Sequence, residues 1–507
     1  MFFFNSTLAI TACVTAAMFS MADLAYDASI INQLLLNDNF RNYFQLNSMW
    51  IGLNTAMVNV GGVLVGPFTG PLLDWVGRKR ALVIGNCIAL IGAAIQSAAP
   101  NEGTLLGGRF ILGLALVITG VAGPALVAES TPAKLHGLLT NCIIIGLPIF
   151  GTISAIIAIV VFDIDSNWGW RGALMGDLAA PLLSLLCLLF APESPRWLAH
   201  KGRMAEARQV LERMHTLQDP DREAVVEVEY GQIVQTIKQE HHAHEAHGYT
   251  GFWSTLAASA ADRRRFAIAV LVNIFCQVSG ANTFPFFLTL VLQQANMGVH
   301  ETLYINLGLC IWGAVSVAVG IWACDYAGAK RSLLFGTTLI TVCLALLAVL
   351  SRLVQSGRSY GIGCVALLFV FQSASFGTWM ILLFAYPPMI LRYSQRASGL
   401  GLAQSVGYGF LVMMTYTLPT ALENLEWRFY AINAAWNIGI IAIIWWLFVE
   451  IKGKTLEEIS ALFDSKVPFE DQAEKGVIEG VPSTAEQADS TRDKAEVDQK
   501  DKRKEEK

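Results

Sequence analysis

The chain has 507 residues, of which 54% are hydrophobic and only 15% are charged, and its formal net charge at pH 7 is −5. Soluble domains have about 45–50% apolar and about 25% charged residues, so this composition excludes an ordinary soluble protein. The small net charge indicates no particular macromolecular partner, and we expect no nucleic acid to bind.

The apolar residues are gathered in twelve long blocks. A helix needs about 20 such residues to cross the hydrocarbon core of a bilayer. We therefore expect an all-α membrane protein with twelve transmembrane helices, in contact with the lipid bilayer. The blocks cover about residues 2–24, 46–69, 81–99, 104–128, 138–162, 173–191, 266–292, 302–323, 332–350, 361–388, 398–420 and 428–449.

The first block has an alternative interpretation as a secretory signal peptide. Residues 1–17, MFFFNSTLAITACVTAA, lack the basic n-region of such a peptide and continue into a longer apolar stretch. These features favour a first membrane helix.

Acidic residues near the end of the first block are unusual. Asp23 and Asp27 lie four positions apart, which is about one helical turn. A carboxylate at bilayer depth costs about 2.5–3.5 kcal/mol on insertion scales. Arg109, in the fourth block, is the only Lys or Arg that we place inside a span. Because an unpaired buried base is also costly, an acid of the first span and Arg109 are expected partners.

Basic residues between the spans predict the orientation of the chain. Outside the long central loop, ten Lys and Arg residues before residue 456 fall on one side of the twelve spans and five on the other. The positive-inside rule then places both termini and the central loop in the cytoplasm.

The chain divides into four predicted regions. Residues 1–192 hold six spans, and 266–450 hold six more. Between them, 193–265 form a charged cytoplasmic linker with short helices. Residues 451–507 form a tail rich in Glu, Lys and Asp, which we expect to be largely disordered.

The two sets of spans show a weak internal repeat. The segment GPLLDWVGRKR at 70–80 has a counterpart in DYAGAKR at 325–331. Asp74 of the first segment and Asp325 of the second are 251 residues apart. Glu193 after the sixth span is matched 257 residues later by Glu450 after the twelfth. Such recurrence predicts two parallel six-helix halves with a substrate site between them near the bilayer midplane.

Several motifs carry a resemblance to a known family. GPLLDWVGRK resembles the signature that follows the second helix in the major facilitator superfamily. PESPRWL after the sixth span, QVSGAN in the seventh and EIKGKTLEEI after the twelfth resemble the sugar porter family within it. YPPMILRYSQRASG and PTALENLEWRFY most resemble the fungal lactose permeases and cellodextrin transporters.

The resemblance implies a transporter that moves a sugar or sugar-like solute by alternating access, and no enzymatic activity. We expect a plasma-membrane location, a monomer, and no cofactor other than a proton as coupling ion. It also implies a charge network that holds the two halves together in one conformation and opens in the other. That network comprises Asp74, Arg78, Lys79, Glu129, Glu193, Arg196, Asp325, Arg331, Arg396 and Glu450. At two further positions the family usually has a charged residue of this network, but this chain has His136 and Met389 there.

Proton-coupled sugar porters pair an Asp of the first span with an Arg of the fourth, and Asp27 and Arg109 stand at those positions. The charge state of a buried carboxyl depends on its solvation and on nearby charge, so small helix movements can change the protonation of Asp27. Our hypothesis is proton symport; the alternative is a static ion pair. We expect Asp23 to face the cavity or a helix end as a secondary polar group.

The resemblance also implies a set of solute contacts. Amides suit sugars because each offers a donor and an acceptor to neighbouring hydroxyl groups. The family's hydroxyl-binding residues are replaced here at Ile144, Cys276, Phe286 and Phe287. A solute less hydroxylated than a hexose, such as a glycoside or a specialised metabolite, therefore stands as an alternative to the favoured typical sugar. The candidate solute-binding residues are Asn141, Gln277, Ser279, Asn282, Phe287, Asn306 and Trp379.

Three alternatives stay open: a transporter of a non-sugar specialised metabolite, a facilitative uniporter, and a non-transporting nutrient sensor. The histidine-rich segment HHAHEAH, from His241 to His247, could place imidazoles on one helical face, but a solvated loop is the interpretation we favour. We therefore expect no metal site.

Overall fold

A computed structural model describes residues 6–45, 48–131, 136–214, 223, 226–231, 233–235, 259–281, 292, 297–354, 357–452 and 463. The chain divides into two compact units, Met1–Gly453 and Lys454–Lys507. The first holds every helix discussed below. The predicted disordered tail lies almost wholly outside the described residues, as do part of the central linker and the segment His241–His247 within it.

Helices dominate the described residues, which contain no β-strand. The first half contains α1 (Ser6–Leu34), α3 (Ser48–Val76), α4 (Arg78–Ser97), α5 (Glu102–Ser130), α6 (His136–Cys142), α7 (Gly146–Phe162), α8 (Asn167–Met175), η2 (Gly176–Leu178) and α9 (Ala179–Leu188). The second contains α13 (Ala260–Val278), α15 (Val299–Ala327), α16 (Ala329–Leu353), α17 (Arg358–Ala374), η6 (Ser375–Trp379), α18 (Met380–Ile390), α19 (Tyr393–Leu425) and α20 (Trp427–Leu447).

Eleven spans in the described part of the chain are long and apolar enough to cross a membrane, and each coincides with a predicted block. The seventh block begins within α13, and most of its second part, from residue 282, lies outside the described residues. The sixth span joins α8, η2 and α9, and the tenth joins α17, η6 and α18. The expected all-α membrane protein is confirmed, and the eleven spans together with α13 fit the twelve-helix arrangement.

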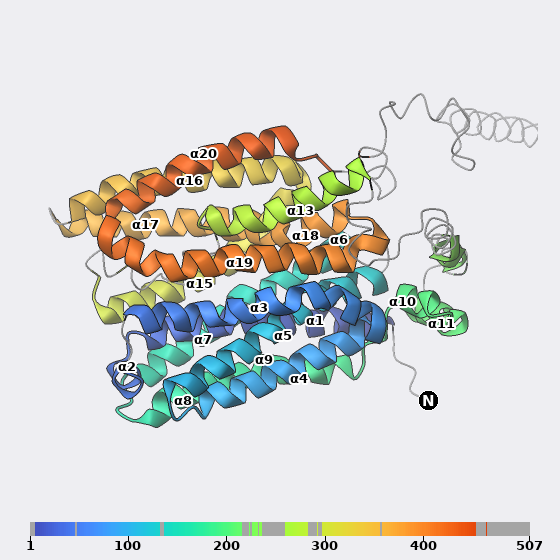
Figure 1. Ribbon diagram of the computed structural model, residues 1–507, viewed down its shortest axis with the longest axis horizontal. Helices are drawn as coiled ribbons and strands as arrows, with labels where there is room; N and C mark the ends of the chain where they lie inside the picture. The colour runs from blue at the N-terminus through green and yellow to red at the C-terminus, as the bar shows by residue number, and fades with distance from the viewer. Residues whose placement is uncertain are drawn as a thin grey trace, which may run out of the picture. The chain divides into compact units, whose positions relative to one another are not determined.

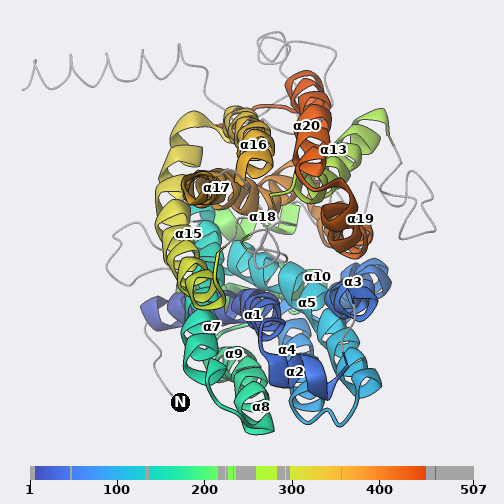
Figure 2. The ribbon, with the colours of Figure 1, turned by 90° about the vertical axis from the view of Figure 1, so that its left-hand side faces the viewer.

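The helices gather in two groups. Helices α1 to α9 form one bundle, in which α5 packs against α3 and α4, and α1 packs against α5, α7 and α9 (Figure 1). Helices α13 to α20 form the second, in which α16 packs against α17 and α20. The view along the helices shows the second group beside the first, with α19 next to α3 and α15 next to α7 (Figure 2).

The contact between α3 and α19 depends on small residues. A Cβ atom added to Gly70 would lie 2.6 Å from the Cα atom of Ser398, and one added to Gly401 would lie 2.6 Å from the carbonyl oxygen of Gly66. The Ser405 hydroxyl donates a hydrogen bond of 2.6 Å to the carbonyl oxygen of Val63. Small side chains let the two backbones approach closely, as is common between membrane helices.

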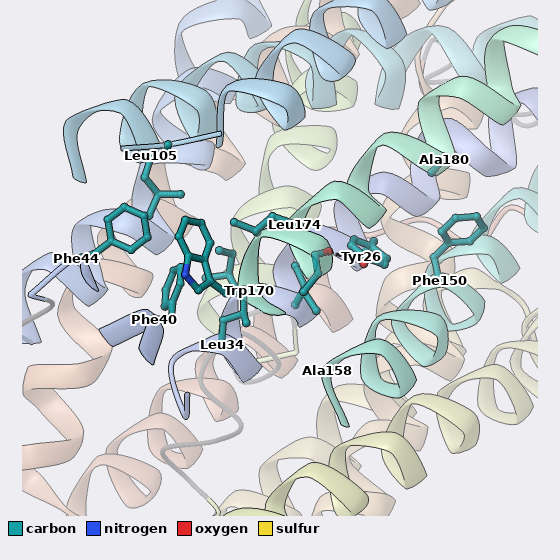
Figure 3. Packing of buried hydrophobic residues seen from close by; sticks show 14 of the residues in the cluster. Tyr26, Leu34, Phe40, Phe44, Leu105, Phe150, Ala158, Trp170, Leu174 and Ala180 are labelled. Atoms are coloured by element: carbon teal, nitrogen blue, oxygen red, sulfur yellow. Dashed lines mark hydrogen bonds between the residues drawn. The ribbon is translucent and has the colours of Figure 1, made fainter. Parts of the chain in front are cut away.

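An aromatic cluster fixes the end of the first bundle that carries the short helix α2 (Asp38–Tyr43). Phe40 and Phe44 pack edge-to-face on Trp170 of α8, with ring centroids 5.7 and 5.1 Å away (Figure 3). Tyr26 of α1 donates a 2.7 Å hydrogen bond to the carbonyl oxygen of Ala173, also in α8. These contacts hold α1 against the sixth span, next to the charged groups described below.

Candidate solute and proton site

A buried ion pair joins α1 and α5. Asp27 Oδ1 lies 3.2 Å from Arg109 Nη1, and each side chain is at most 2% exposed. Arg109 Nε also donates a 2.7 Å hydrogen bond to the carbonyl oxygen of Asn54 in α3. The predicted partners therefore meet, and the guanidinium connects three helices of the first half.

Two more carboxyl groups lie in the same interior. Asp23 is 2% exposed and Asp177, in η2, is fully buried. The charges of Asp23, Asp27 and Arg109 all act on Asp177, and Gln96 Nε2 of α4 donates a 2.6 Å hydrogen bond to Asp177 Oδ2. Asp23 is not among the residues that line the cavity described next, which was one of the two positions that we expected for it. Sequence reasoning missed Asp177, although it is an acid within the sixth apolar block and the rule applied to Asp27 would have found it.

A large cavity lies between the two halves and contains about 1310 Å³ of empty space, including its opening to solvent. Its lining comes from α1, α7, α13, α15, α17, η6, α18 and α19. None of the lining residues is Asp, Glu, Lys, Arg or His. Six are amides: Asn32, Asn273, Gln277, Asn306, Gln372 and Gln404.

The predicted solute contacts fall into three groups. Gln277 and Asn306 line the cavity, and the Asn306 amide nitrogen has no hydrogen-bond partner among the described residues. Asn141 and the buried Ser279 and Trp379 are not among the lining residues; the Ser279 hydroxyl instead contacts backbone atoms at the end of α13. Asn282 and Phe287 lie outside the described residues. Sequence reasoning missed Asn32, Asn273, Gln372 and Gln404, since an amide in a span gives no sign of the direction it faces.

Charged residues meet at the end of the first half that carries α10 (Pro195–His200) and α11 (Met204–Met214). Arg78 Nη1 lies 3.3 Å from Asp74 Oδ1, and Arg78 Nε lies 3.0 Å from Glu129 Oε2. The Ser194 hydroxyl also donates a hydrogen bond to Glu129. These contacts connect α3, α4, α5 and the start of α10.

Glu193 completes this group through the backbone. Its Oε1 accepts a 2.8 Å hydrogen bond from the backbone N–H of Lys79, while the Lys79 ammonium bonds the carbonyl oxygen of Ala191. The preceding Gly77 has φ 101° and ψ 163°, a conformation that is essentially restricted to glycine.

The second half repeats this arrangement. Gly328 has φ 92° and ψ 158°, and Glu450 Oε2 accepts a 3.4 Å hydrogen bond from the backbone N–H of Arg331. The structural repeat matches the one predicted from the sequence. Asp325 and Arg331 are exposed and Arg396 is buried. The Arg78 ion pairs with Asp74 and Glu129 lie within the first half. Contacts that hold the two halves together through Arg196, Arg331, Arg396 and Glu450 are still a prediction.

Metal ligands do not gather in the described residues, which contain no group of three His, Cys, Asp or Glu side chains able to hold a metal ion. The segment His241–His247 is outside them.

Comparison with known proteins decides the family. The family described as "Sugar (and other) transporter" matches residues 3–463. The chain belongs to this family. Its resemblance to sugar porters of the major facilitator superfamily is thereby confirmed. Sugar porters are membrane transporters of small solutes, not enzymes, so the expectations of a multi-pass transporter and of no enzymatic function are confirmed as well.

Individual relatives of this sugar porter are distant. The MFS-type transporter criB of Aspergillus cristatus is 24% identical over 457 residues, 90% of this chain and 93% of the relative. A high-affinity glucose transporter of Kluyveromyces lactis is 23% identical over 479 residues, 90% of this chain and 84% of the relative. The proton:xylose symporter XylE of E. coli, solved with 6-bromo-6-deoxy-D-glucose, has the same fold, with a TM-score of 0.78 and 18% identity over 91% of this chain and all of XylE.

Proposed function

We propose that this sugar porter is a proton symporter for a neutral sugar or glycoside. The observation that carries the proposal is the buried Asp27–Arg109 pair, because α1 also lines the cavity with Leu24, Ala25 and Ala28. A change in the charge of Asp27 therefore acts on the same helix that faces the solute.

The mechanism follows from electrostatics. When Asp27 is ionised, it balances Arg109 and holds α1 to α5. When Asp27 takes a proton, the pair loses its attraction, and Arg109 keeps only its hydrogen bond to Asn54 on α3. The relative energies of the two conformations of the transporter then change, and the proton gradient is coupled to solute movement.

The chemistry of the cavity supports a neutral solute. An ionised solute would enter a site whose described lining offers no opposite charge, at a high desolvation cost. The six amides can each donate to and accept from hydroxyl groups. Phe371, Phe376 and Phe384 offer apolar faces for a ring.

A second candidate solute is a specialised metabolite with few hydroxyl groups. The apolar part of the lining favours it, since Leu147, Leu309, Met380 and Leu383 lie among the amides. Ile144 and Cys276 stand where the family has hydroxyl-binding residues. Both side chains are fully or almost fully buried, and neither lines the cavity.

The remaining parts of the proposal concern the cell. The excess of basic residues in the predicted cytoplasmic loops supports cytoplasmic termini, and we propose a monomer in the plasma membrane. No cofactor other than the coupling proton is required.

The test is uptake into proteoliposomes that contain the purified protein. Labelled glucose, xylose, cellobiose and an aryl β-glucoside are offered at equal concentration. We expect at least one of the four to be taken up, and unlabelled copies of that solute to compete. Uptake restricted to a charged solute, or no uptake of any of these four neutral compounds, would contradict the proposed solute class.

A further inference from the structure

The end of α13 lies beside the cavity, inside the predicted seventh span. The helix ends at Val278, Ser279 is its C-terminal cap, and Gly280 has a φ of 90°. A helix that ends leaves its last carbonyl groups without helical donors. Because hydrocarbon offers no water to such groups, each of them needs a donor from the protein.

The chain itself supplies the first of these donors. The backbone N–H of Ser279 donates a 2.8 Å hydrogen bond to the carbonyl oxygen of Phe275, and that of Gly280 donates a 3.3 Å bond to Gln277. The Ser279 hydroxyl donates to the carbonyl oxygen of Cys276 at 3.3 Å. These three bonds serve carbonyl groups up to Gln277.

Helix α20 supplies donors for the next two carbonyl groups. Trp436 Nε1 donates a 2.9 Å hydrogen bond to the carbonyl oxygen of Val278, and Asn437 Nδ2 donates a 3.2 Å bond to that of Ser279. Asn437 is fully buried, and its amide oxygen has no partner among the described residues. A buried amide is costly unless it is hydrogen-bonded, so the bond to Ser279 is what offsets the cost of this side chain.

The contact is confined to the last residues of α13. This helix packs chiefly against α18 and α19, and much less against α20. Trp436 and Asn437 are adjacent in the chain, and so are the two carbonyl groups to which they donate. Loss of either donor therefore acts on one short stretch of backbone.

That stretch directly follows a residue of the cavity wall. Gln277 lines the cavity and is 5% exposed, whereas Trp436 and Asn437 are not among the lining residues. The two bonds from α20 hold the backbone on the C-terminal side of Gln277. Without them, the end of α13 and the Gln277 amide could move relative to the rest of the wall.

We propose that Trp436 and Asn437 are positioning residues of the solute site. They act through the end of α13 and fix the place of the Gln277 amide on the cavity wall. The effect on transport rests on the solute class proposed above, whereas the position of Gln277 is a property of the protein alone.

The first experiment needs no solute. Gln277→Cys is combined with Trp436→Phe, which keeps an aromatic ring but removes the N–H donor, or with Asn437→Leu, which has a similar size and no donor. The proteins in proteoliposomes are treated with methyl methanethiosulfonate, a small uncharged reagent, and mass spectrometry gives the rate of modification at position 277. Cys310 lines the same cavity from α15 and is the internal reference.

A matched control comes from the same helix. Trp446→Phe makes the same change at a position that is 77% exposed. We expect modification at position 277 to be about two- to tenfold faster in the Trp436→Phe and Asn437→Leu proteins, as the loss of one hydrogen bond implies. Cys310 and the Trp446→Phe control should keep the rates of the parent protein. Unchanged rates at position 277, or equal acceleration at position 277 and Cys310, would overturn the proposal.

The second experiment measures KM and maximal rate of uptake for labelled glucose, xylose, cellobiose and an aryl β-glucoside. For a solute that the wild type takes up, we expect Trp436→Phe and Asn437→Leu to raise KM by about two- to tenfold with little change in maximal rate. Neither change should raise KM further in a Gln277→Ala background, because the residue they position is then absent.

The outcomes separate the two proposals. A full additional rise in KM in the Gln277→Ala background would show that the α20 residues act elsewhere, and would overturn the positioning role. If the wild type takes up none of the four compounds, the proposed solute class is refuted, and the modification rates at position 277 still decide the positioning role.

Discussion

Asp27 of α1 and Arg109 of α5 contact each other at 3.2 Å in the interior of the first half, although 82 positions separate them in the chain. The contact leaves neither charge alone in the membrane. It also connects α1, which contributes to the cavity lining, to α5, which packs against α3 and α4. On the proposed mechanism, transport and stability therefore depend on the same pair.

Removal of the base tests its contribution to stability. Arg109→Gln leaves Asp27 buried without a counter-charge, and loss of one partner of a buried pair costs about 3–5 kcal/mol. We expect a lower melting temperature in detergent. The double variant Asp27→Asn with Arg109→Gln removes both charges and is expected to recover much of the loss. Additive losses in the double variant would show that the two side chains do not depend on each other.

The cavity prediction concerns Asn306 of α15, whose buried amide nitrogen at the cavity wall has no partner in the part of the chain that the structure describes. If it donates to a solute hydroxyl group, Asn306→Ala removes a hydrogen bond worth about 0.5–1.5 kcal/mol. We expect KM to rise by about two- to tenfold, measured as initial uptake rate against solute concentration. Asn424→Ala, at an exposed position of α19 away from the cavity, is the control. An unchanged KM in Asn306→Ala would remove this residue from the solute site.

Backbone conformation at Gly77 and Gly328 makes a separate prediction. A Cβ atom added to Gly77 would lie 2.6 Å from Glu193 Oε2, and one added to Gly328 would meet Glu450 in the same way. Alanine at either position adds strain of about 1–3 kcal/mol. Thermal unfolding in detergent should show a clear loss of stability for both. Gly107→Ala in α5 has open space around its added methyl group, and we expect no loss there. Equal stability of all three variants would refute the repeated glycine–glutamate arrangement.

The sequence was most informative where one physical rule was sufficient. Apolar length predicted the spans, because a bilayer tolerates little else. The cost of lone charges predicted the Asp27–Arg109 pair. Asp177 follows from the same rule, but a single acid is enough to balance Arg109, so the rule does not require a third carboxyl group.

Positions that depend on helix rotation were harder to predict. Trp379 is the last residue of the π-helical segment η6, whose wider turn changes the register of the side chains that follow. Ser279 lies at the end of α13, where its hydroxyl contacts backbone. Neither position could be placed from spacing alone. Asn306 and Gln277 reach the cavity lining as expected.

Proton-driven accumulation provides the most direct measurement of the central claim. Proteoliposomes with an acidic exterior are compared with vesicles at equal pH on both sides, for the wild type and for Asp27→Asn. On the proposed mechanism the proton is a co-substrate, so lower external pH should increase accumulation by the wild type.

The variant carries a neutral side chain in both conformations and cannot exchange a proton at this position. We therefore predict that the wild type concentrates its solute only when the pH gradient is present. Asp27→Asn should lose most of that accumulation but still exchange labelled for unlabelled solute. Wild-type transport that ignores the gradient, or undiminished accumulation by Asp27→Asn, would contradict a coupling role for the Asp27–Arg109 pair.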